Sequence, residues 1–258
     1  MSRKKLMLFV ATFCILIIVI VTWQFSFVLR NVFINQSGFV SKDNKAYFSP
    51  LLSPSLQDSL NSLVQKAEQR NIAFWGINDH KYKIIFCANN NEVGKYSGND
   101  QFHTVSRRTL LLGTFTVIGR EGFNVDVISH ELCHSYFWSQ LSYFDKRKIP
   151  TWFDEGLASQ LDYRSFLNDS VFERNYVTNY DILRNIETPE QFYKGGWPLM
   201  KKNYIIARIE IKQFLNSCGI EGIKQIIENL NKGDNFVASY KKIKETCHGA
   251  SRLLGEGN

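Results

Sequence analysis

The sequence lacks internal repeats and low-complexity tracts, and its 258 residues include only five histidines and five prolines. These absences exclude a repeat architecture and a mainly disordered chain. Three of the charges behind the net +7 belong to the amino-terminal Arg3, Lys4 and Lys5, so the rest of the chain is only mildly basic. It shows no nucleic-acid-binding signature. With 44% hydrophobic residues, the chain is long enough for one domain with its own core.

Charge is absent from one long stretch, which contains no Asp, Glu, Lys, Arg or His over 6–29. Its most apolar part, 6–23, would measure roughly 27 Å as a helix, close to the hydrocarbon thickness of a bilayer. The sequence therefore predicts an uncleaved signal-anchor, a transmembrane helix over 6–28, behind a cytoplasmic flank at 1–5. A cleaved signal peptide is the alternative, but no small-x-small cleavage site follows Val21.

This reading predicts a single-pass membrane protein. Its amino terminus would be cytoplasmic and its main domain extracytoplasmic, on the periplasmic or extracellular side. The membrane is then one expected partner, through the amino-terminal helix. The sequence specifies no oligomeric state.

Cysteines are few. Four lie outside the apolar stretch: Cys87, Cys133, Cys218 and Cys247. Cys218 and Cys247 both end predicted neighbouring helices, which makes them the plausible disulfide pair, while free buried thiols are the alternative.

The remainder of the chain divides into a polar linker at 29–53 and a folded domain at 54–258. Leucines at helical spacing behind Pro54 predict a first helix. β-branched and aromatic residues predict strands at 81–88 and 114–119, separated by a loop rich in turn-forming residues. The later predicted helices begin near Asn124 and Thr151 and then cover 203–217, 220–231 and 235–247.

A short motif carries the chemistry, His130-Glu131-Leu132-Cys133-His134. On a helix the two imidazoles lie one turn apart on one face, so both reach a single ion. A hydrolytic zinc site needs three protein ligands and one open position for water. Glu155, in "TWFDEGLAS" after an interval of twenty residues, would face them from a second, antiparallel helix. A glutamate in so apolar a setting needs a partner such as a metal to remain ionised.

Together the two motifs resemble the gluzincin metallopeptidases of the peptidase MA-like superfamily, in which His-Glu-x-x-His precedes Trp-x-x-Glu-Gly. The resemblance covers roughly 80–220. It implies that His130, His134 and Glu155 bind Zn²⁺ and that Glu131 is the general base. It also implies an α+β, zincin-like domain, with a small mixed sheet, an active-site helix and a helical carboxy-terminal part, here behind one transmembrane helix.

No branch of the family is matched throughout. Phe137 and Gln140 stand where metzincins have a glycine and a third histidine. Ser159 occupies the position at which the thermolysin-like branch places an aspartate, and "TVIGREGFN" replaces the element that grips an amino terminus in aminopeptidases. The branch is therefore left unassigned.

The function implied is that of a membrane-anchored zinc metallopeptidase of the endopeptidase kind, acting on a peptide or protein substrate. Zinc would lower the pKa of its water towards about 7, and Glu131 would take up the proton. The strand at 114–119 would align an extended peptide. The alternative function is a catalytically silent peptidase-like domain that binds extended peptides or glycopeptides.

The sequence also offers candidates for supporting roles. Relatives steady the oxyanion with a tyrosine or histidine on a later helix, and Tyr204 opens such a helix. Its competitors for this role are Tyr176, Tyr180 and Tyr193. Either Asp126 or Asp154 would orient a ligand imidazole. The remaining histidines are expected to face solvent: His80, His103 and His248.

Overall fold

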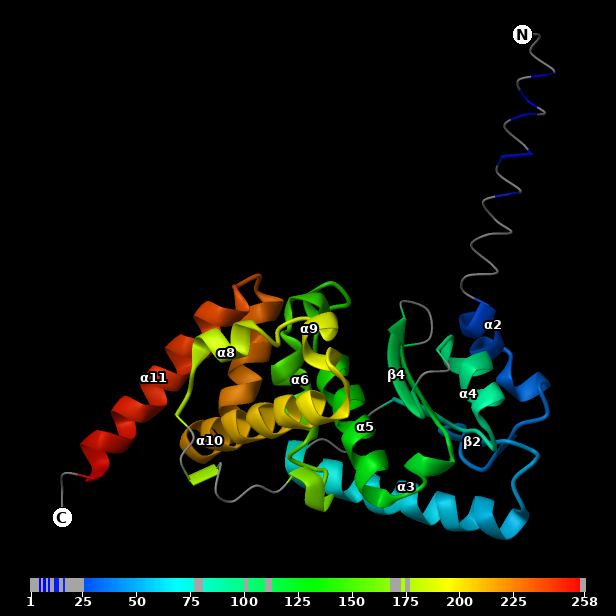
Figure 1. The fold of residues 1–258 in the computed structure, drawn as a ribbon, viewed down its shortest axis with the longest axis horizontal. Helices are drawn as coiled ribbons and strands as arrows, with labels where there is room; N and C mark the ends of the chain where they lie inside the picture. Colours follow the sequence, from blue (N-terminus) through cyan, green and yellow to red (C-terminus); the bar gives the residue numbers. More distant parts are fainter. Residues whose placement is uncertain are drawn as a thin grey trace.

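The computed structural model describes 26–76, 81–99, 102–109, 113–167, 173–174 and 177–255, together with Lys5, Met7, Phe9, Thr12, Phe13 and Leu16. Beyond residue 247 only the backbone is described. A five-stranded sheet with helices on both faces forms one part of the molecule, and a helical carboxy-terminal part forms the other (Figure 1). Helix α5 (Val125–Ser139) lies between the two parts.

The sheet is mixed, with strand order β1-β2-β3-β5-β4. Strands β2, β3 and β5 are parallel to one another, whereas β1 and β4 are antiparallel to their single neighbours. β4 is therefore an edge strand. The bounds are β1 Val40–Ser41, β2 Ala46–Phe48, β3 Lys83–Phe86, β4 Thr104–Thr109 and β5 Gly113–Ile118.

Helices cover both faces of the sheet. Helix α3 (Pro54–Trp75) and α5 pack on one face, in a core that includes Ile84, Phe86 and Leu132. Helix α2 (Ser26–Val32) and α4 (Asn90–Ser97) lie over the opposite face. The α4 segment belongs to the stretch expected to be a loop. Its start is fixed by the Asn89 side chain, which accepts from the Glu92 backbone N–H, so a turn-forming residue here caps a helix.

The carboxy-terminal part is built from five helices within the described residues. They are α6 Thr151–Ala158, α8 Tyr180–Arg184, α9 Pro189–Tyr193, α10 Gly196–Asn231 and α11 Phe236–Gly255. Helix α10 is interrupted at Gly219, whose φ of 62° leaves the helical region. The break expected between 217 and 220 is therefore present. A disulfide between Cys218 and Cys247, whose Cα atoms lie 5.4 Å apart, joins α10 to α11.

Single turns of 3-10 helix connect these elements: η1 Ile34–Gln36, η2 Arg120–Gly122, η3 Asp145–Lys148 and η4 Ser165–Leu167. Cys87 and Cys133 are free and buried. One core cluster holds α5, α6, α10 and α11 together, with Phe153 and Phe214 fully buried within it. Helix α5 is thus fixed on both sides, by the sheet core and by the carboxy-terminal core.

The segment 29–53, expected to be a linker, contains part of this fold. Strand β2 lies within it, and its three residues are buried and pair with β3. Helix α2 also extends into the segment, where the Asn31 amide donates to the Tyr96 carbonyl at 2.7 Å. The polar composition conceals these elements because only a few apolar residues are needed for a short strand.

The expected transmembrane anchor is corrected by the structure. Within the ranges it describes, no helix is both long enough and apolar enough to cross a membrane. Helix α2, with seven residues, is only about 10 Å long. The long α10 carries charged side chains along its length, such as Lys201, Lys202 and Lys212. Most of 6–28 lies outside the described residues.

Several other expectations depended on that anchor and are corrected with it. They are the fold class with an amino-terminal transmembrane helix, the membrane as a partner, and a single-pass topology with a cytoplasmic amino terminus and an extracytoplasmic domain. The described fold is a mixed α/β arrangement of a five-stranded sheet and helices.

Candidate metal centre

Helix α5 presents the two histidines of the motif. It begins at Val125 because the Asn124 side chain accepts from the Val127 backbone N–H at 2.9 Å. Asp126, in the first turn of this helix, is paired with Arg70 at 2.7 Å. His130 and His134 follow one turn apart, and each is only 5% exposed.

Helix α6 brings Glu155 to the histidines, and that side chain is 7% exposed. The following residue explains how close the helices come. A Cβ on Gly156 would lie 2.4 Å from the Ala207 carbonyl oxygen of α10, so only glycine fits there. Glu155 therefore supplies the carboxylate that faces the histidines, and Gly156 allows α6 to pack closely against α10.

The three side chains converge on one point. His130 Nε2 lies 3.1 Å from Glu155 Oε2 and 3.2 Å from His134 Nε2, and His134 Nε2 lies 3.6 Å from Glu155 Oε2. Ligand atoms around a tetrahedral ion with bonds of about 2.0–2.1 Å are separated by about 3.3 Å. The buried His130, His134 and Glu155 group can thus hold a metal ion.

Two further carboxylates face the outer nitrogens of the imidazoles. His134 Nδ1 lies 2.7 Å from Asp154 Oδ1, and the Trp138 indole donates to Asp154 Oδ2 at 2.8 Å. His130 Nδ1 lies 3.6 Å from Asp162 Oδ2, just beyond hydrogen-bond distance. Both Nε2 atoms are therefore directed at the point where a metal would bind, the usual arrangement in metal sites.

Of the two aspartates proposed to orient an imidazole, the structure brings Asp154 to the site and places Asp126 away from it. Asp162 is the carboxylate that sequence reasoning missed. It lies in the irregular segment after α6 and is fully buried, and Arg164 holds both of its carboxylate oxygens. No spacing rule signals it, because its approach to His130 depends on the chain reversing after α6.

The charges of the group are mutually dependent. Burial by itself would raise the pKa of Glu155, but the neighbouring His134 and His130 outweigh burial and hold this pKa well below its ordinary value. Burial would lower the pKa of His134, but Asp154 and Glu155 outweigh it and raise this pKa well above its ordinary value. A divalent cation therefore competes with a proton for this site, and its binding would release protons.

Glu131 lies beside the group and is only half-buried. The Ser106 hydroxyl donates to Glu131 Oε2 at 2.6 Å and lies 2.5 Å from the Thr116 hydroxyl. Ser106 belongs to β4, the edge strand. The strand at 114–119, expected to align a peptide, corresponds to β5, which is hydrogen-bonded on both sides. That expectation is wrong, and β4 is the strand with an open edge next to the candidate site.

Two tyrosines line the same site. The Tyr193 hydroxyl, from α9, donates to Glu155 Oε1. Tyr204, from α10, packs with its ring centroid 6.2 Å from that of His130 and 5.0 Å from that of Phe192. Burial, followed by the charge of Glu155, raises the pKa of both phenols well above the ordinary value, which keeps them protonated and able to donate.

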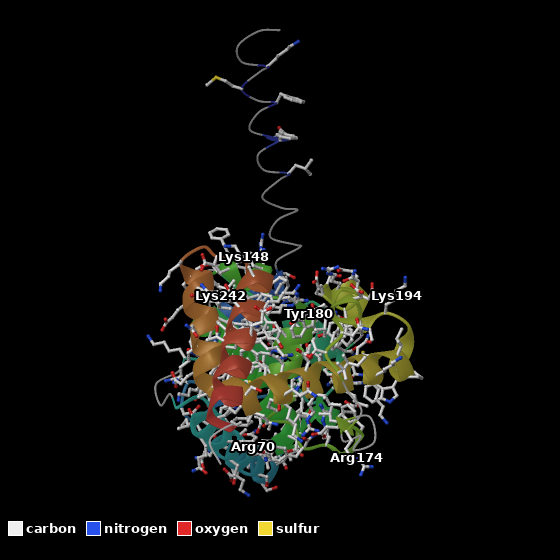
Figure 2. All side chains as sticks on the ribbon, turned by 90° about the vertical axis from the view of Figure 1, so that its left-hand side faces the viewer. Arg70, Lys148, Arg174, Tyr180, Lys194 and Lys242 are labelled. Atoms are coloured by element: carbon white, nitrogen blue, oxygen red, sulfur yellow. A yellow bond between two sulfur atoms is a disulfide. The ribbon has the colours of Figure 1, made fainter. Side chains whose placement is uncertain are left out.

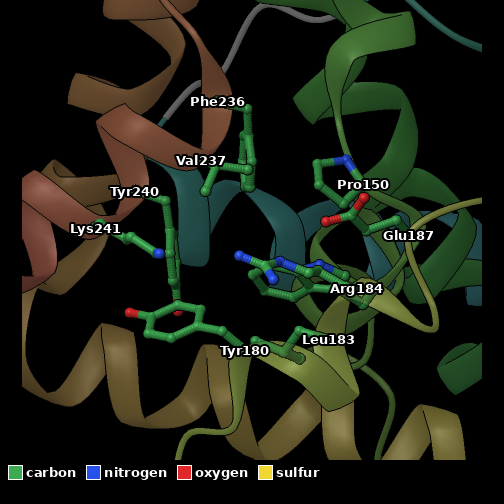
Figure 3. A pocket seen from close by; sticks show the side chains of 10 residues that line it. Pro150, Tyr180, Leu183, Arg184, Glu187, Phe236, Val237, Tyr240 and Lys241 are labelled. Atoms are coloured by element: carbon green, nitrogen blue, oxygen red, sulfur yellow. The ribbon is translucent and has the colours of Figure 1, made fainter.

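The other candidates are elsewhere or beyond description. Tyr180 lies in a small second cavity of about 20 Å³ between α8 and α11, beside Arg184 and Lys241 (Figure 3). That volume holds about one water molecule. Tyr176 and His80 are outside the described residues, and only the backbone of His248 is described. The His103 side chain is 53% exposed and pairs with Glu121 at 3.1 Å.

A cavity of about 500 Å³ opens over the metal group. The edge strand, α5, η3, α6 and the start of α10 all contribute to its walls. Its aromatic lining residues include Phe102, Trp138, Phe166 and Trp197, and its basic ones are Arg107, Lys146 and Arg164. The volume is of the size that takes several residues of an extended peptide or a small organic ligand.

Comparison of the chain with protein-family models and with curated proteins gave no match. The likeness to gluzincins accordingly rests on the two sequence motifs. The geometry of the residues in those motifs is observed in the structure and does not depend on that likeness.

Proposed function

We propose that this protein is a zinc-dependent metallopeptidase that hydrolyses peptide bonds. The observation that supports the proposal most directly is the triangle formed by His130 Nε2, His134 Nε2 and Glu155 Oε2, with Glu131 on the same helix beside it. Two imidazoles and one carboxylate are the ligand set of hydrolytic zinc sites, which leave the fourth position open. Bound zinc supplies Lewis acidity to a substrate carbonyl and lowers the pKa of a water molecule.

Glu131 is the proposed general base. Its carboxylate would take a proton from the attacking water and later deliver it to the leaving amine. Ser106 holds Oε2 of this carboxylate at 2.6 Å, which leaves Oε1 as the oxygen that accepts the proton. Because Glu131 is half-buried in the wall of the cavity, it can reach both water and substrate.

The tyrosines have separate proposed roles. Tyr193 already donates to Glu155 Oε1, so its role would be to orient that ligand. Tyr204 lines the cavity above His130 and would donate to the oxyanion that forms on the substrate carbonyl.

Substrate alignment is proposed to occur on β4. An extended peptide can pair with the open edge of a sheet through backbone hydrogen bonds. Thr104, Val105 and Ser106 of this strand line the cavity, so a peptide paired with it would pass over the metal group. This argument supports peptide binding whether or not catalysis follows, and a catalytically silent peptide-binding domain is the second candidate function.

Metal content and peptide cleavage by the full-length protein test the proposal together. We expect about one zinc per chain and a sharp loss in His134→Ala, because one of three protein ligands is removed. Glu131→Gln should retain zinc, whereas cleavage should fall by at least about a hundredfold, the lower end of what a general base contributes. Glu228→Gln, an exposed change on α10, is the matched control.

The outcomes separate the candidates. Zinc binding without cleavage of any peptide in a broad library would favour the silent binding domain. Equal cleavage by wild type and Glu131→Gln would refute the proposed chemistry, and absence of zinc from the wild-type chain would refute the metal assignment.

A further inference from the structure

Acidic and basic side chains are distributed unequally in the cavity over the metal group. Two of its acids, Asp154 and Glu155, are 8% and 7% exposed and are engaged by the histidines. The basic residues Lys146 and Arg164 are half-buried and line the open space. Apart from Glu131, a molecule in the cavity therefore meets mainly positive charge, to which a bound divalent metal would add.

Lys146 lies on the His134 side of this cavity. Its Nζ is 4.3 Å from the centroid of the Trp138 ring, and Trp138 stacks on His134 with ring centroids 5.2 Å apart. Within the described part of the chain no carboxylate pairs with Lys146. Cations in a partly desolvated cavity are normally paired, so this ammonium gains most from an anionic ligand.

The neighbouring cations of the same turn are engaged elsewhere. Lys148 pairs with Asp145 at 2.6 Å and is seen at the surface in Figure 2. The guanidinium of Arg147 lies over the Tyr143 ring at 5.8 Å. Of these consecutive basic residues in η3, Lys146 is the one that lines the cavity.

Arg164 occupies the His130 side. Its Nε and Nη2 donate to Asp162, the carboxylate that faces His130, and its guanidinium lies over Phe166 at 4.9 Å. None of the described residues accepts a hydrogen bond from its Nη1. One edge of the guanidinium thus supports the metal site, and the other remains available to a ligand carboxylate, for which its geometry is well suited.

We infer that the substrate is an acidic peptide, whose carboxylate side chains flank the scissile bond and bind Lys146 on one side and Arg164 on the other. The inference rests on the proposed peptidase function and specifies its substrate class. Arg107, the third basic residue lining the cavity, is already engaged within the protein. Its Nε donates to the Ser97 carbonyl, and its guanidinium lies over Phe27.

The test uses extended peptides that are identical except for Glu, Gln or Lys at one of the two positions flanking the scissile bond, with each position varied separately. Binding is measured by fluorescence anisotropy on the zinc-loaded Glu131→Gln protein, and kcat/KM is measured on the wild type. The Glu peptide should bind at least about fivefold more tightly than the Gln peptide, as expected for hydrogen bonds to charged groups. The Lys peptide should bind most weakly, and added salt should reduce the differences.

Variants then show which residue is responsible for the charge preference at each flanking position. Lys146→Ala should remove most of the preference at one flanking position, and Lys146→Glu should invert it there by favouring the Lys peptide. Arg147→Ala makes the same change in charge on the neighbouring residue and should leave the preference intact. Arg164→Gln should weaken the preference at the other position, with zinc content measured in parallel because Asp162 loses its partner.

Equal binding of the Glu and Gln peptides, or a preference that both Lys146 variants leave unchanged at each flanking position, would overturn the inference. This result is distinguishable from failure of the proposed function. Charge-dependent binding without cleavage would refute only the peptidase, and cleavage without charge preference would refute only the acidic-substrate inference.

Discussion

The hydroxyl of Ser106 and the Oε2 of Glu131 lie 2.6 Å apart, which links the edge strand of the sheet to the proposed general base. Thr116 of the adjacent β5 lies 2.5 Å from the same hydroxyl, so the serine is fixed from both sides. A single contact thus connects the surface proposed to bind the peptide to the group proposed to activate water. The relationship could not be read from the sequence, in which the two residues are twenty-five positions apart.

Removal of this contact should affect catalysis without affecting the metal. We expect Ser106→Ala to lower kcat by about tenfold, because a hydrogen bond to a charged group is worth about 1.5–3 kcal/mol and here it orients the base. Zinc content should remain that of the wild type. Thr109→Ala, at the far end of the same strand, controls for general disturbance of the edge. An unchanged kcat in Ser106→Ala would show that Glu131 does not need this partner.

The two carboxylates behind the histidines should contribute unequally to metal affinity. Asp154→Asn removes a charge 2.7 Å from His134 Nδ1, whereas Asp162→Asn removes one 3.6 Å from His130 Nδ1. Such outer carboxylates typically change metal affinity by about 10–100-fold. We expect a larger loss in Asp154→Asn, measured by competition with a chromophoric chelator. Wild-type affinity in both variants would show that neither carboxylate supports its histidine.

The geometry of the metal group was predictable because it depends on local rules. Two histidines one turn apart on a helix must share a face, and an antiparallel second helix is the simplest way to bring Glu155 opposite them. Asp154 lies on that second helix and was one of two aspartates predicted to orient an imidazole, the other being Asp126. The structure brings His130, His134 and Glu155 together as the spacing suggests, and it places Asp154 against His134.

The parts that the sequence did not reveal depend on contacts between distant segments. Asp162 and Arg164 approach His130 only because the chain turns back after α6, and no periodicity marks such a turn. Strand β4 escaped notice because its sequence, "TVSRRT", is polar and half-buried throughout, as an edge strand can be. Strand β2 was taken for linker because it contributes only three residues, Ala46–Phe48, to an otherwise polar segment.

Gly156 provides a test of the packing behind Glu155. In Gly156→Ala the new Cβ would meet the Ala207 carbonyl at 2.4 Å and the Ile211 side chain at 2.8 Å, so α6 and α10 would have to separate. Overpacking of this kind costs about 1–3 kcal/mol of unfolding free energy, measurable by urea denaturation. Because Glu155 precedes the glycine, zinc affinity should fall as well. A variant with wild-type stability and wild-type zinc affinity would show that the two helices can part freely.

The Cys218–Cys247 disulfide should stabilise the packing of α11 on α10 without affecting the metal site. Its loop spans 29 positions, and a disulfide of this kind contributes about 2–4 kcal/mol to stability. Cys218→Ser with Cys247→Ser should lower the thermal midpoint while leaving zinc content unchanged. The denatured, unreduced wild type should titrate three thiols, five cysteines less the two in the bridge. Five titratable thiols would show that the bridge does not form.

The two tyrosines of the site give the last prediction, because different roles are proposed for them. Tyr193 donates to the ligand Glu155, so Tyr193→Phe should weaken zinc binding measurably, with a fall in activity that excess zinc restores. Tyr204 lines the cavity over His130, and its proposed role is to donate to the substrate oxyanion, so Tyr204→Phe should retain zinc.

Activity of Tyr204→Phe should fall by about a hundredfold in kcat with little change in KM, the pattern of a group that acts on the oxyanion, and added zinc should not restore it. Both variants keep the aromatic ring, so packing against Phe192 and Phe102 is preserved and each serves as the control for the other. If the effects were exchanged, with Tyr193→Phe retaining zinc and losing kcat, the oxyanion role would pass to Tyr193.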